Sequence, residues 1–250
     1  MHILLTNDDG FFAPGLQALY RALLEEPGYV VSIVAPESQR SACGHAITLF
    51  DPLFVVEHPV EGNGKGFAVR GTPSDCVKLA IQAELVPKPD WVISGINLGP
   101  NLGTDVFYSG TVSAAMEGVL AGVPAIAASL ASFEYTDFDP SAKWLAEFLK
   151  QEGRSHQDGL LNINFPGQPR ETWQGVRVVR LGTAVYNDVF ESRIDPHGRR
   201  YFWQGGTLSV ERKTNTDLAA IAQGSISITP MHSDLTDYPK LKEWGLKSLV

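Results

Sequence analysis

Two adjacent aspartates, Asp8 and Asp9, come directly after a short apolar run at residues 3–5 and just before Gly10. Side chains alternate between the two faces of a strand, so both carboxylates converge only if the backbone turns here, and glycine permits such a turn. Two carboxylates held together raise each other's pKa, and a cation between them removes that penalty. The loop therefore predicts one divalent metal ion, Mg²⁺ or Mn²⁺, at the carboxyl end of the first strand of an α/β sheet. The alternative interpretation is that Asp8 caps the next helix and Asp9 lies in solvent.

Composition restricts the classes of partner. The chain has 250 residues, a formal charge of −8 and 44% hydrophobic residues, which is enough for one large core with or without an appendage. The acidic balance argues against a nucleic-acid polymer as a partner, whereas a mononucleotide stays compatible because a bound metal supplies positive charge.

Cysteine usage and hydropathy indicate the compartment. Cys43 and Cys76 lack metal-site spacing and are predicted to be free thiols in a reducing environment. The apolar run at residues 3–5 is too short for a signal peptide. The most apolar longer stretch, residues 119–131, is interrupted by Gly122 and Pro124, so no membrane span is expected. We expect a cytoplasmic protein with no membrane partner.

The first 35 residues predict a strand, a helix over residues 16–24 and a second strand over residues 29–35, the length of a right-handed parallel unit. No G-x-G-x-x-G loop joins strand to helix, which argues against an NAD or FAD protein. The polar loop at residues 36–48 follows the second strand. It contains Ser38 and Ser41 as alternative metal ligands, Arg40 as an anion partner, and His45, although each is also typical of an ordinary loop.

The middle of the chain predicts a hairpin over residues 53–57 and 67–70, then a helix to about residue 85 capped by Thr72 or Ser74. A buried strand at residues 91–94 leads into a loop at residues 94–103 that contains Asn97 and Asn101. Asn97 is expected just past the strand, on the same edge as the two aspartates, where its neutral carbonyl oxygen suits Mg²⁺ or Mn²⁺. Left-handed turn conformations of both asparagines are the alternative.

Small and hydroxylated residues begin the next predicted helix, residues 112–121. Amides at a helix start, preceded by glycine and flanked by hydroxyls, form an anion site, so Ser109, Gly110 and Thr111 are predicted to bind phosphate opposite the metal. An N-cap role for Ser or Thr is compatible with that interpretation. A strand at residues 123–129, a helix at 139–150 and strands at 160–165 and 176–181 complete the expected core.

The C-terminal third predicts an appendage. Residues 183–223 indicate an extended hairpin arm for oligomerisation, because the aromatic run at residues 201–203 needs burial and a protruding arm finds it on another subunit. A short helix is expected to start at Thr216 and Asp217. Residues 224–250 form a last strand and terminal segment, in which His232 and Asp234 are more typical of incidental loop residues than of a site. The expected core is residues 1–182.

Six ordered motifs resemble one known family. They lie at residues 3–10 with 13–15, at 34–36 followed by Arg40 and Ser41, and at 71–77, 94–103, 108–112 and 227–230. The chain is identified by them as a member of the SurE (stationary-phase survival protein) family of metal-dependent nucleotidases. The resemblance implies a Rossmann-like three-layer α/β core with a mostly parallel sheet and a protruding β-hairpin arm. It also implies homodimers or homotetramers assembled through swapped C-terminal elements.

The resemblance further implies a reaction and a set of site residues. The reaction is removal of phosphate from nucleoside 5′- and 3′-monophosphates, with action on short-chain polyphosphate. The implied metal ligands are Asp8, Asp9, Ser41 and Asn97; the family pattern favours Ser41 over Ser38. Asp8 and Asp9 are the expected catalytic residues, and Asn97, Ser109, Gly110 and Thr111 the expected phosphate-binding residues.

Three alternatives stay open at this point. An aspartate could attack the phosphoryl group directly in place of a water molecule. Paired acids after an early strand also occur in phosphoacceptor receiver modules, but a free-standing unit of roughly 120 residues and a late lysine do not fit this chain. A metal-stabilised nucleotide-binding protein without turnover is the third.

Overall fold

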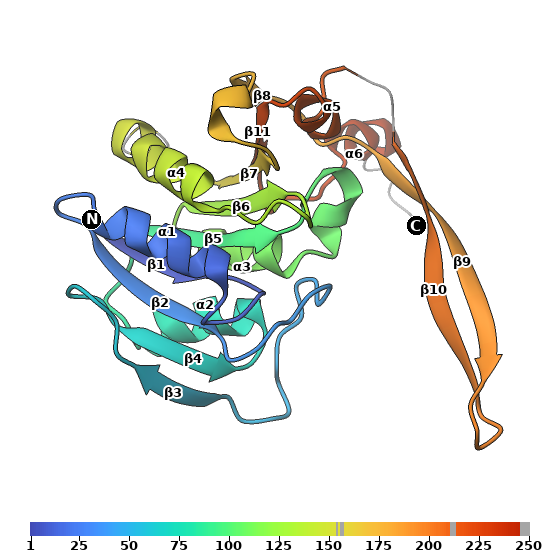
Figure 1. The fold of residues 1–250 in the computed structure, drawn as a ribbon, viewed down its shortest axis with the longest axis horizontal. Helices are drawn as coiled ribbons and strands as arrows, with labels where there is room; N and C mark the ends of the chain where they lie inside the picture. Colours follow the sequence, from blue (N-terminus) through green and yellow to red (C-terminus); the bar gives the residue numbers. More distant parts are fainter. Residues whose placement is uncertain (154, 156–157, 211–213, 246–250) are drawn as a thin grey trace.

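One mixed sheet organises the computed structural model, which describes residues 1–153, 155, 158–210 and 214–245. Its nine strands follow the order β3-β4-β2-β1-β5-β6-β7-β11-β8 (Figure 1). Their bounds are β1 His2–Thr6, β2 Val30–Pro36, β3 Phe54–His58, β4 Gly66–Arg70, β5 Trp91–Leu98, β6 Ala125–Ala131, β7 Leu160–Pro166, β8 Val176–Val178 and β11 Ile226–Met231. Among the described pairs of this sheet, only β3–β4 and β7–β11 are antiparallel. The expectation of a mostly parallel sheet is confirmed.

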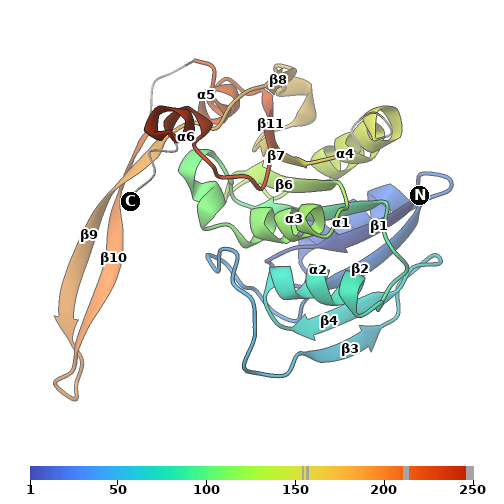
Figure 2. The same cartoon turned by 180° about the vertical axis from the view of Figure 1, so that it is seen from behind.

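Helices cover both faces of this sheet. The helices α1 (Pro14–Leu24) and α4 (Asp139–Glu152) lie on one face, and α2 (Pro73–Gln82) and α3 (Gly110–Leu120) lie on the other (Figures 1 and 2). The first strand shows how the sequence produces this: Ile3 and Leu5 pack into the core beneath α1 and α4, whereas Leu4 packs into the core beneath α2 and α3. Because successive apolar side chains of this strand point to opposite faces of the sheet, both faces are buried, and the result is the predicted three-layer core.

The carboxyl ends of four parallel strands create one polar edge. Strands β4, β2, β1 and β5 are neighbours in the sheet and run in the same direction. The loops that follow them therefore meet, as expected for a ligand site in an open α/β sheet. The helix after β4 begins with Thr72, whose side chain accepts from the Asp75 amide, so the structure selects Thr72 over Ser74 as the N-cap.

The fifth strand is longer than the sequence indicates. Residues 94–98, expected as the start of a loop, continue β5, although its pairing with β6 shifts in register between Ser94 and Asn97. Asn97 therefore lies within the end of the strand and not past it. The expectation was wrong because glycine at position 95 is typical of a loop, whereas here it allows the irregular pairing with β6: a Cβ on Gly95 would lie 2.3 Å from the Ala128 carbonyl oxygen.

A two-stranded arm leaves the core. Strands β9 (Ala184–Ile194) and β10 (Arg200–Val210) pair with each other over their full length and project away from the main sheet (Figures 1 and 2). Tyr201, Phe202 and Trp203 are all exposed on it. A hairpin is therefore present within the predicted 183–223 segment, of which residues 211–213 lie outside the described part of the chain.

Short elements complete the chain: η1 (Gly103–Phe107), η2 (Arg170–Thr172), α5 (Asp217–Ala222) and α6 (Tyr238–Trp244). The predicted start of α5 is confirmed, since the Thr216 side chain accepts from the Ala219 amide. The buried Asp217 carboxylate accepts from the Gly103 and Gly182 amides at 2.7 and 2.8 Å, which ties this helix to the loop after β5. The predicted terminal segment is described only to residue 245. Among the described helices, none is long and apolar enough to cross a membrane.

Candidate active site

The loop after β1 turns as its sequence indicates. The Asn7 side chain donates to the Gly10 carbonyl at 2.9 Å and accepts from the Gly10 amide at 3.1 Å, and Gly10 has φ +107°. A left-handed residue at this point favours glycine. Asn7 is thus the residue that closes the turn, and the turn directs the next two carboxylates to different partners.

Asp8 lies at the start of α3. Its Oδ1 accepts from the Thr111 hydroxyl at 2.5 Å, and the Thr111 backbone also hydrogen-bonds to it. A Cβ added to Gly110 would lie 2.8 Å from the Asp8 Cβ, so only glycine lets the helix approach this closely. The alternative in which Asp8 caps the next helix, α1, is wrong, because the N-cap of α1 is Ala13, with no side-chain cap.

Asp9 faces the end of β5. Its Oδ2 accepts from the Leu98 amide at 3.1 Å, and its Oδ1 accepts from the Gln39 side chain at 3.4 Å. Asp9 is therefore half-buried and hydrogen-bonded, which contradicts the alternative of a freely solvated carboxylate. In the described part of the chain, neither Asp8 nor Asp9 forms a salt bridge with a lysine or arginine.

Burial makes these carboxylates hard to ionise. Burial raises the pKa of Asp8 to about 6, the hydrogen bond from Thr111 opposes this rise, and the charge of Asp9 adds to it. Burial also raises the pKa of Asp9, against the hydrogen bonds from Leu98 and Gln39. A cation beside the two carboxylates would compensate for this cost.

The loop after β2 brings Ser41 to the same edge. Gln39 donates through Nε2 to the Ser41 Oγ at 3.0 Å as well as to Asp9, and the Arg40 amide donates to the Asp8 carbonyl at 2.7 Å. Gln39 was missed at the sequence level, where no pattern distinguishes it from other polar loop residues. It connects the predicted ligand Ser41 with Asp9.

Tertiary contacts hold the Ser41 loop against α2 and α3. His45 pairs through Nε2 with Glu117 Oε2 at 2.9 Å, and Lys78 pairs with Glu117 Oε1 at 2.9 Å. The Gly44 amide donates to the Tyr108 carbonyl at 3.0 Å. Ala42 has φ +55°, a conformation that favours glycine, so these contacts hold the loop in a shape its own sequence does not favour. His45 therefore anchors the loop on α3.

Asn97 and Asn101, which the sequence presents as equivalent, have different roles. Asn97 donates from Nδ2 to the Gly99 carbonyl at 2.8 Å and lines the pocket described next. Asn101 is buried: its backbone amide donates to Asn164 Oδ1 at 2.9 Å, and its side chain donates to Ser129 Oγ at 2.8 Å. Asn101 thus fixes the loop onto β6 and β7.

A pocket of about 560 Å³ opens beside these groups. Its walls carry most of the predicted site residues together with aromatic side chains and one arm residue; they are Asp8, Ser41, Ala42, Asn97, Leu98, Gly99, Pro100, Asn101, Asp105, Tyr108, Ser109, Phe133 and Gln204. Ser109 is the N-cap of α3 and accepts from the Val112 amide at 3.0 Å. Of the predicted phosphate-binding residues, Asn97 and Ser109 therefore line the pocket, whereas Gly110 and Thr111 contact Asp8.

The composition of the site limits the metals it suits. The described residues contain no cluster of three or more His, Cys, Asp or Glu side chains arranged to hold a metal. The predicted ligands, two carboxylates with the neutral oxygens of Ser41 and Asn97, would form an all-oxygen donor set, which suits Mg²⁺ or Mn²⁺ better than zinc or copper.

The fold and site define a class: a three-layer α/β protein with paired acids after its first strand. The family model described as Survival protein SurE matches residues 3–188. A protein named 5′-nucleotidase SurE from Desulfitobacterium hafniense (strain DSM 10664 / DCB-2) is 64% identical over 243 residues, which cover 97% of this chain and 95% of that protein. A protein of the same name from Pelotomaculum thermopropionicum is 52% identical over 255 residues, covering 100% of this chain and 95% of its own.

A solved structure agrees with these relatives. The SurE protein from Aquifex aeolicus has a TM-score of 0.83 and 38% sequence identity, with 97% of this chain and 98% of that chain covered. The chain belongs to the SurE family, as its motifs indicate.

We predict that Asp8 lowers the stability of the metal-free protein as the pH rises. Folding raises the pKa of Asp8 from 3.8 to about 6, so the folded state favours the protonated carboxyl. The free energy of unfolding therefore keeps its full value below pH 3.8 and falls as the pH rises through about 6. The free energy of unfolding lost in this way is roughly 3 kcal/mol. Urea unfolding in EDTA from pH 4 to 7 should show wild type losing stability relative to Asp8→Asn. Parallel pH profiles of the two proteins would contradict this.

A second prediction concerns the anchor of the Ser41 loop. Burial raises the pKa of Glu117, but its pairs with Lys78 and His45 outweigh this and leave the pKa lowered, so the carboxylate stabilises the fold above pH 4.5 and less as the pH falls below it. At pH 7, Glu117→Gln should lower the free energy of unfolding by about 1–3 kcal/mol, because both partners are partly exposed. Glu147→Gln is the matched control, because its pair with Arg170 is exposed and is worth at most about 1 kcal/mol. Equal losses in the two variants would refute the anchoring role.

Proposed function

We propose that the protein is a metal-dependent phosphomonoesterase that releases phosphate from nucleoside 5′- and 3′-monophosphates, with short-chain polyphosphate as a further substrate class. The observation that carries the proposal is a buried carboxylate, Asp8, on the wall of a pocket that Ser41, Asn97 and Ser109 also line. The name 5′-nucleotidase SurE carried by the relatives supports the reaction class.

The residues present fit one divalent metal ion, Mg²⁺ or Mn²⁺. Asp8, Asp9, Ser41 and Asn97 would hold it, since the two acids face no lysine or arginine partner in the described residues and their pKa values are both raised. The Asn97 Nδ2 is directed to Gly99, which leaves the carbonyl oxygen of that amide for a cation. A divalent ion bound here would polarise the phosphoryl group and lower the pKa of a bound water.

The protein's own groups position the reactants. Thr111 fixes the orientation of Asp8, and Leu98 with Gln39 fixes that of Asp9. Asp9, held in place by these hydrogen bonds, orients or deprotonates the attacking water, with Asp8 as the alternative base.

Two side chains are suited to hold phosphate oxygens. The Ser109 Oγ accepts from the Val112 amide, so its own hydrogen is free to be donated to a phosphate oxygen. Asn97 has a second Nδ2 hydrogen for the same purpose. Gly110 and Thr111 contribute through the start of α3, whose positive end faces Asp8 and the phosphate beyond it.

We further propose that the enzyme is a cytoplasmic homodimer or homotetramer. Exposed aromatic side chains on the arm and exposed Leu241 and Trp244 on α6 support burial against, or exchange with, another copy. The last strand, β11, pairs with β7 and β8 of its own chain, so an exchange would involve the segment after it. The free thiols of Cys43 and Cys76 support a reducing compartment.

Phosphate release from a panel of nucleoside monophosphates with Mg²⁺ or Mn²⁺ tests the proposal. Asp9→Asn should lower kcat by at least about 100-fold, because it removes a charged ligand and base, while the thermal unfolding midpoint stays close to that of wild type. Glu134→Gln, a change at an exposed acid, should retain full activity. Nucleotide binding without phosphate release by wild type would instead identify a binding protein, and stable phosphorylation by a small phosphodonor would identify a receiver.

Single turnover in ¹⁸O-water, with enzyme in excess, distinguishes the two nucleophiles. Attack by water is expected to place the label directly in the released phosphate. Mass spectrometry of the peptide that contains Asp8 and Asp9 measures the alternative: label appearing first in a carboxylate would show that an aspartate is the nucleophile.

A further inference from the structure

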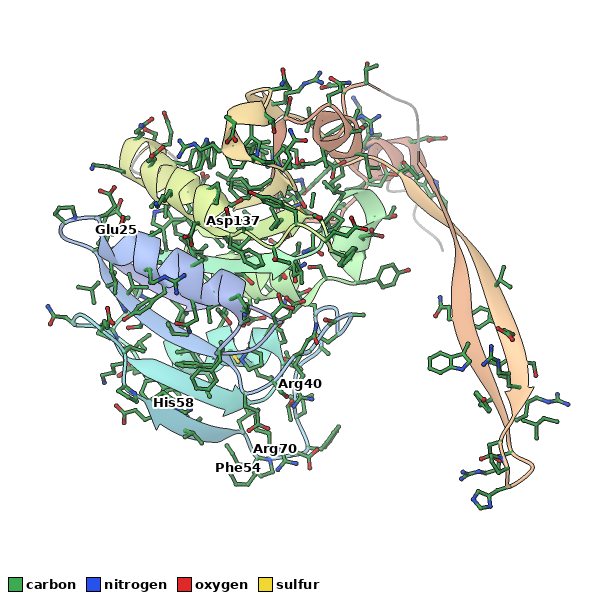
Figure 3. All side chains as sticks on the ribbon, in the orientation of Figure 1. Glu25, Arg40, Phe54, His58, Arg70 and Asp137 are labelled. Carbon is green, nitrogen blue, oxygen red and sulfur yellow. The ribbon has the colours of Figure 1, made fainter. Side chains whose placement is uncertain are left out.

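Two arginines whose side chains have no partner among the described residues line a second pocket at the same edge of the sheet. This pocket, of about 430 Å³, is formed by Arg40, Thr48, Asp51, Pro52, Phe54, Arg70, Gly71 and Thr72. It shares no lining residue with the pocket beside Asp8. Figure 3 shows Arg40, Arg70 and Phe54 gathered at one corner of the molecule, below the carboxyl end of β2.

The two guanidinium groups are not neutralised by any residue that the structure describes. In the described residues, neither Arg40 nor Arg70 forms a salt bridge, and no side-chain hydrogen bond of either is present. The Nε of Arg40 is buried and has no hydrogen-bond partner. A buried donor of this kind is costly, and an oxyanion that accepts from it would remove the cost.

The hydroxyls around the arginines are already used. Thr48 donates to Asp75 Oδ2 at 2.6 Å, and Thr72 donates to the Ala46 carbonyl at 2.7 Å. Asp75 also accepts from the Thr48 and Thr72 amides, so its carboxylate is satisfied behind the pocket wall. The groups left for a ligand are therefore the two guanidinium groups, opposed by the single exposed carboxylate of Asp51.

An aromatic ring stands directly beside one of the arginines. Phe54 and Arg70 are register partners across the antiparallel β3–β4 pair, so their side chains lie on the same face of the sheet as neighbours. Phe54 is 58% exposed although it is a large apolar side chain. An exposed ring next to a cationic group suits a planar heterocycle that carries a phosphate.

We propose that the pocket of Arg40, Arg70 and Phe54 is a second nucleotide site, in which the arginines bind a phosphate group and Phe54 stacks on the base. Each guanidinium presents a planar fork that matches phosphate oxygens. The site goes beyond the proposed reaction, since its one carboxylate, Asp51, lies beside two arginines and no paired acids are present to hold a metal. A ligand bound there lies close to the proposed active site, because the Arg40 amide donates to the Asp8 carbonyl and Ser41 is the next residue.

Isothermal titration of the full-length protein in EDTA tests the site, with adenosine 5′-monophosphate and inorganic phosphate as separate probes. Arg70→Ala should weaken binding of both by at least about tenfold, since it removes a charge-assisted contact. Asp51→Asn should strengthen both several-fold, because it removes the opposing charge; a gain of affinity is not explained by misfolding. Arg21→Ala, the same charge change at an exposed position on α1, is the control and should alter neither.

Phe54→Ala distinguishes the two sources of phosphate. A nucleotide site requires that this variant lose affinity for adenosine 5′-monophosphate by about fivefold or more while inorganic phosphate binds as before. Equal affinities in Phe54→Ala and wild type would overturn the nucleotide assignment, and unchanged binding in both Arg70→Ala and Asp51→Asn would overturn the site itself. Phosphate release with Mn²⁺ is measured on the same proteins. Absence of phosphate release by wild type would refute the proposed function and leave the second site standing. Full phosphate release by Arg70→Ala, together with its loss of binding in the titration, would support a site separate from the active site.

Discussion

The hydrogen bond from Thr111 to Asp8 is the contact on which the candidate site depends. It holds a carboxylate that is 5% exposed against the first turn of α3, and no lysine or arginine of the described chain neutralises it. The close approach requires glycine at position 110. At the helix start, the Thr111 hydroxyl is therefore occupied by Asp8. This arrangement leaves the pKa of Asp8 at about 6, and a bound cation would lower it again. The protein therefore keeps a destabilising negative charge at the place where the proposed chemistry needs one.

Around that contact, the loops after β1, β2 and β5 depend on one another. Gln39 connects Asp9 with Ser41, the Leu98 amide binds Asp9, and Glu117 holds His45 and with it the loop that carries Ser41. Each loop alone is polar and irregular. Together they form an edge in which oxygen ligands come from three separate segments, and the rigid parallel strands beneath set their spacing.

The same edge carries two pockets with opposite electrostatics. One presents acids and neutral oxygens, and the other presents two guanidinium groups and an aromatic ring. The loop after β2 supplies both, through Ser41 on one side and Arg40 on the other. Because these residues are adjacent, a ligand of the proposed second site would bind within one residue of the proposed metal ligand Ser41.

The sequence by itself determined the layered α/β fold, the turn at Asn7–Gly10, the hairpins and the proximity of the loops, because these follow from local periodicity, glycine placement and the direction of parallel strands. The family motifs added the choice of Ser41. Only the tertiary structure decided that β5 extends to Leu98, that Asn101 is tied to β6 and β7 by buried hydrogen bonds while the Asn97 side chain donates to the Gly99 carbonyl, and that Thr111 bonds to Asp8. Those outcomes depend on which distant residue fills each hydrogen bond, and spacing along one chain does not contain that information.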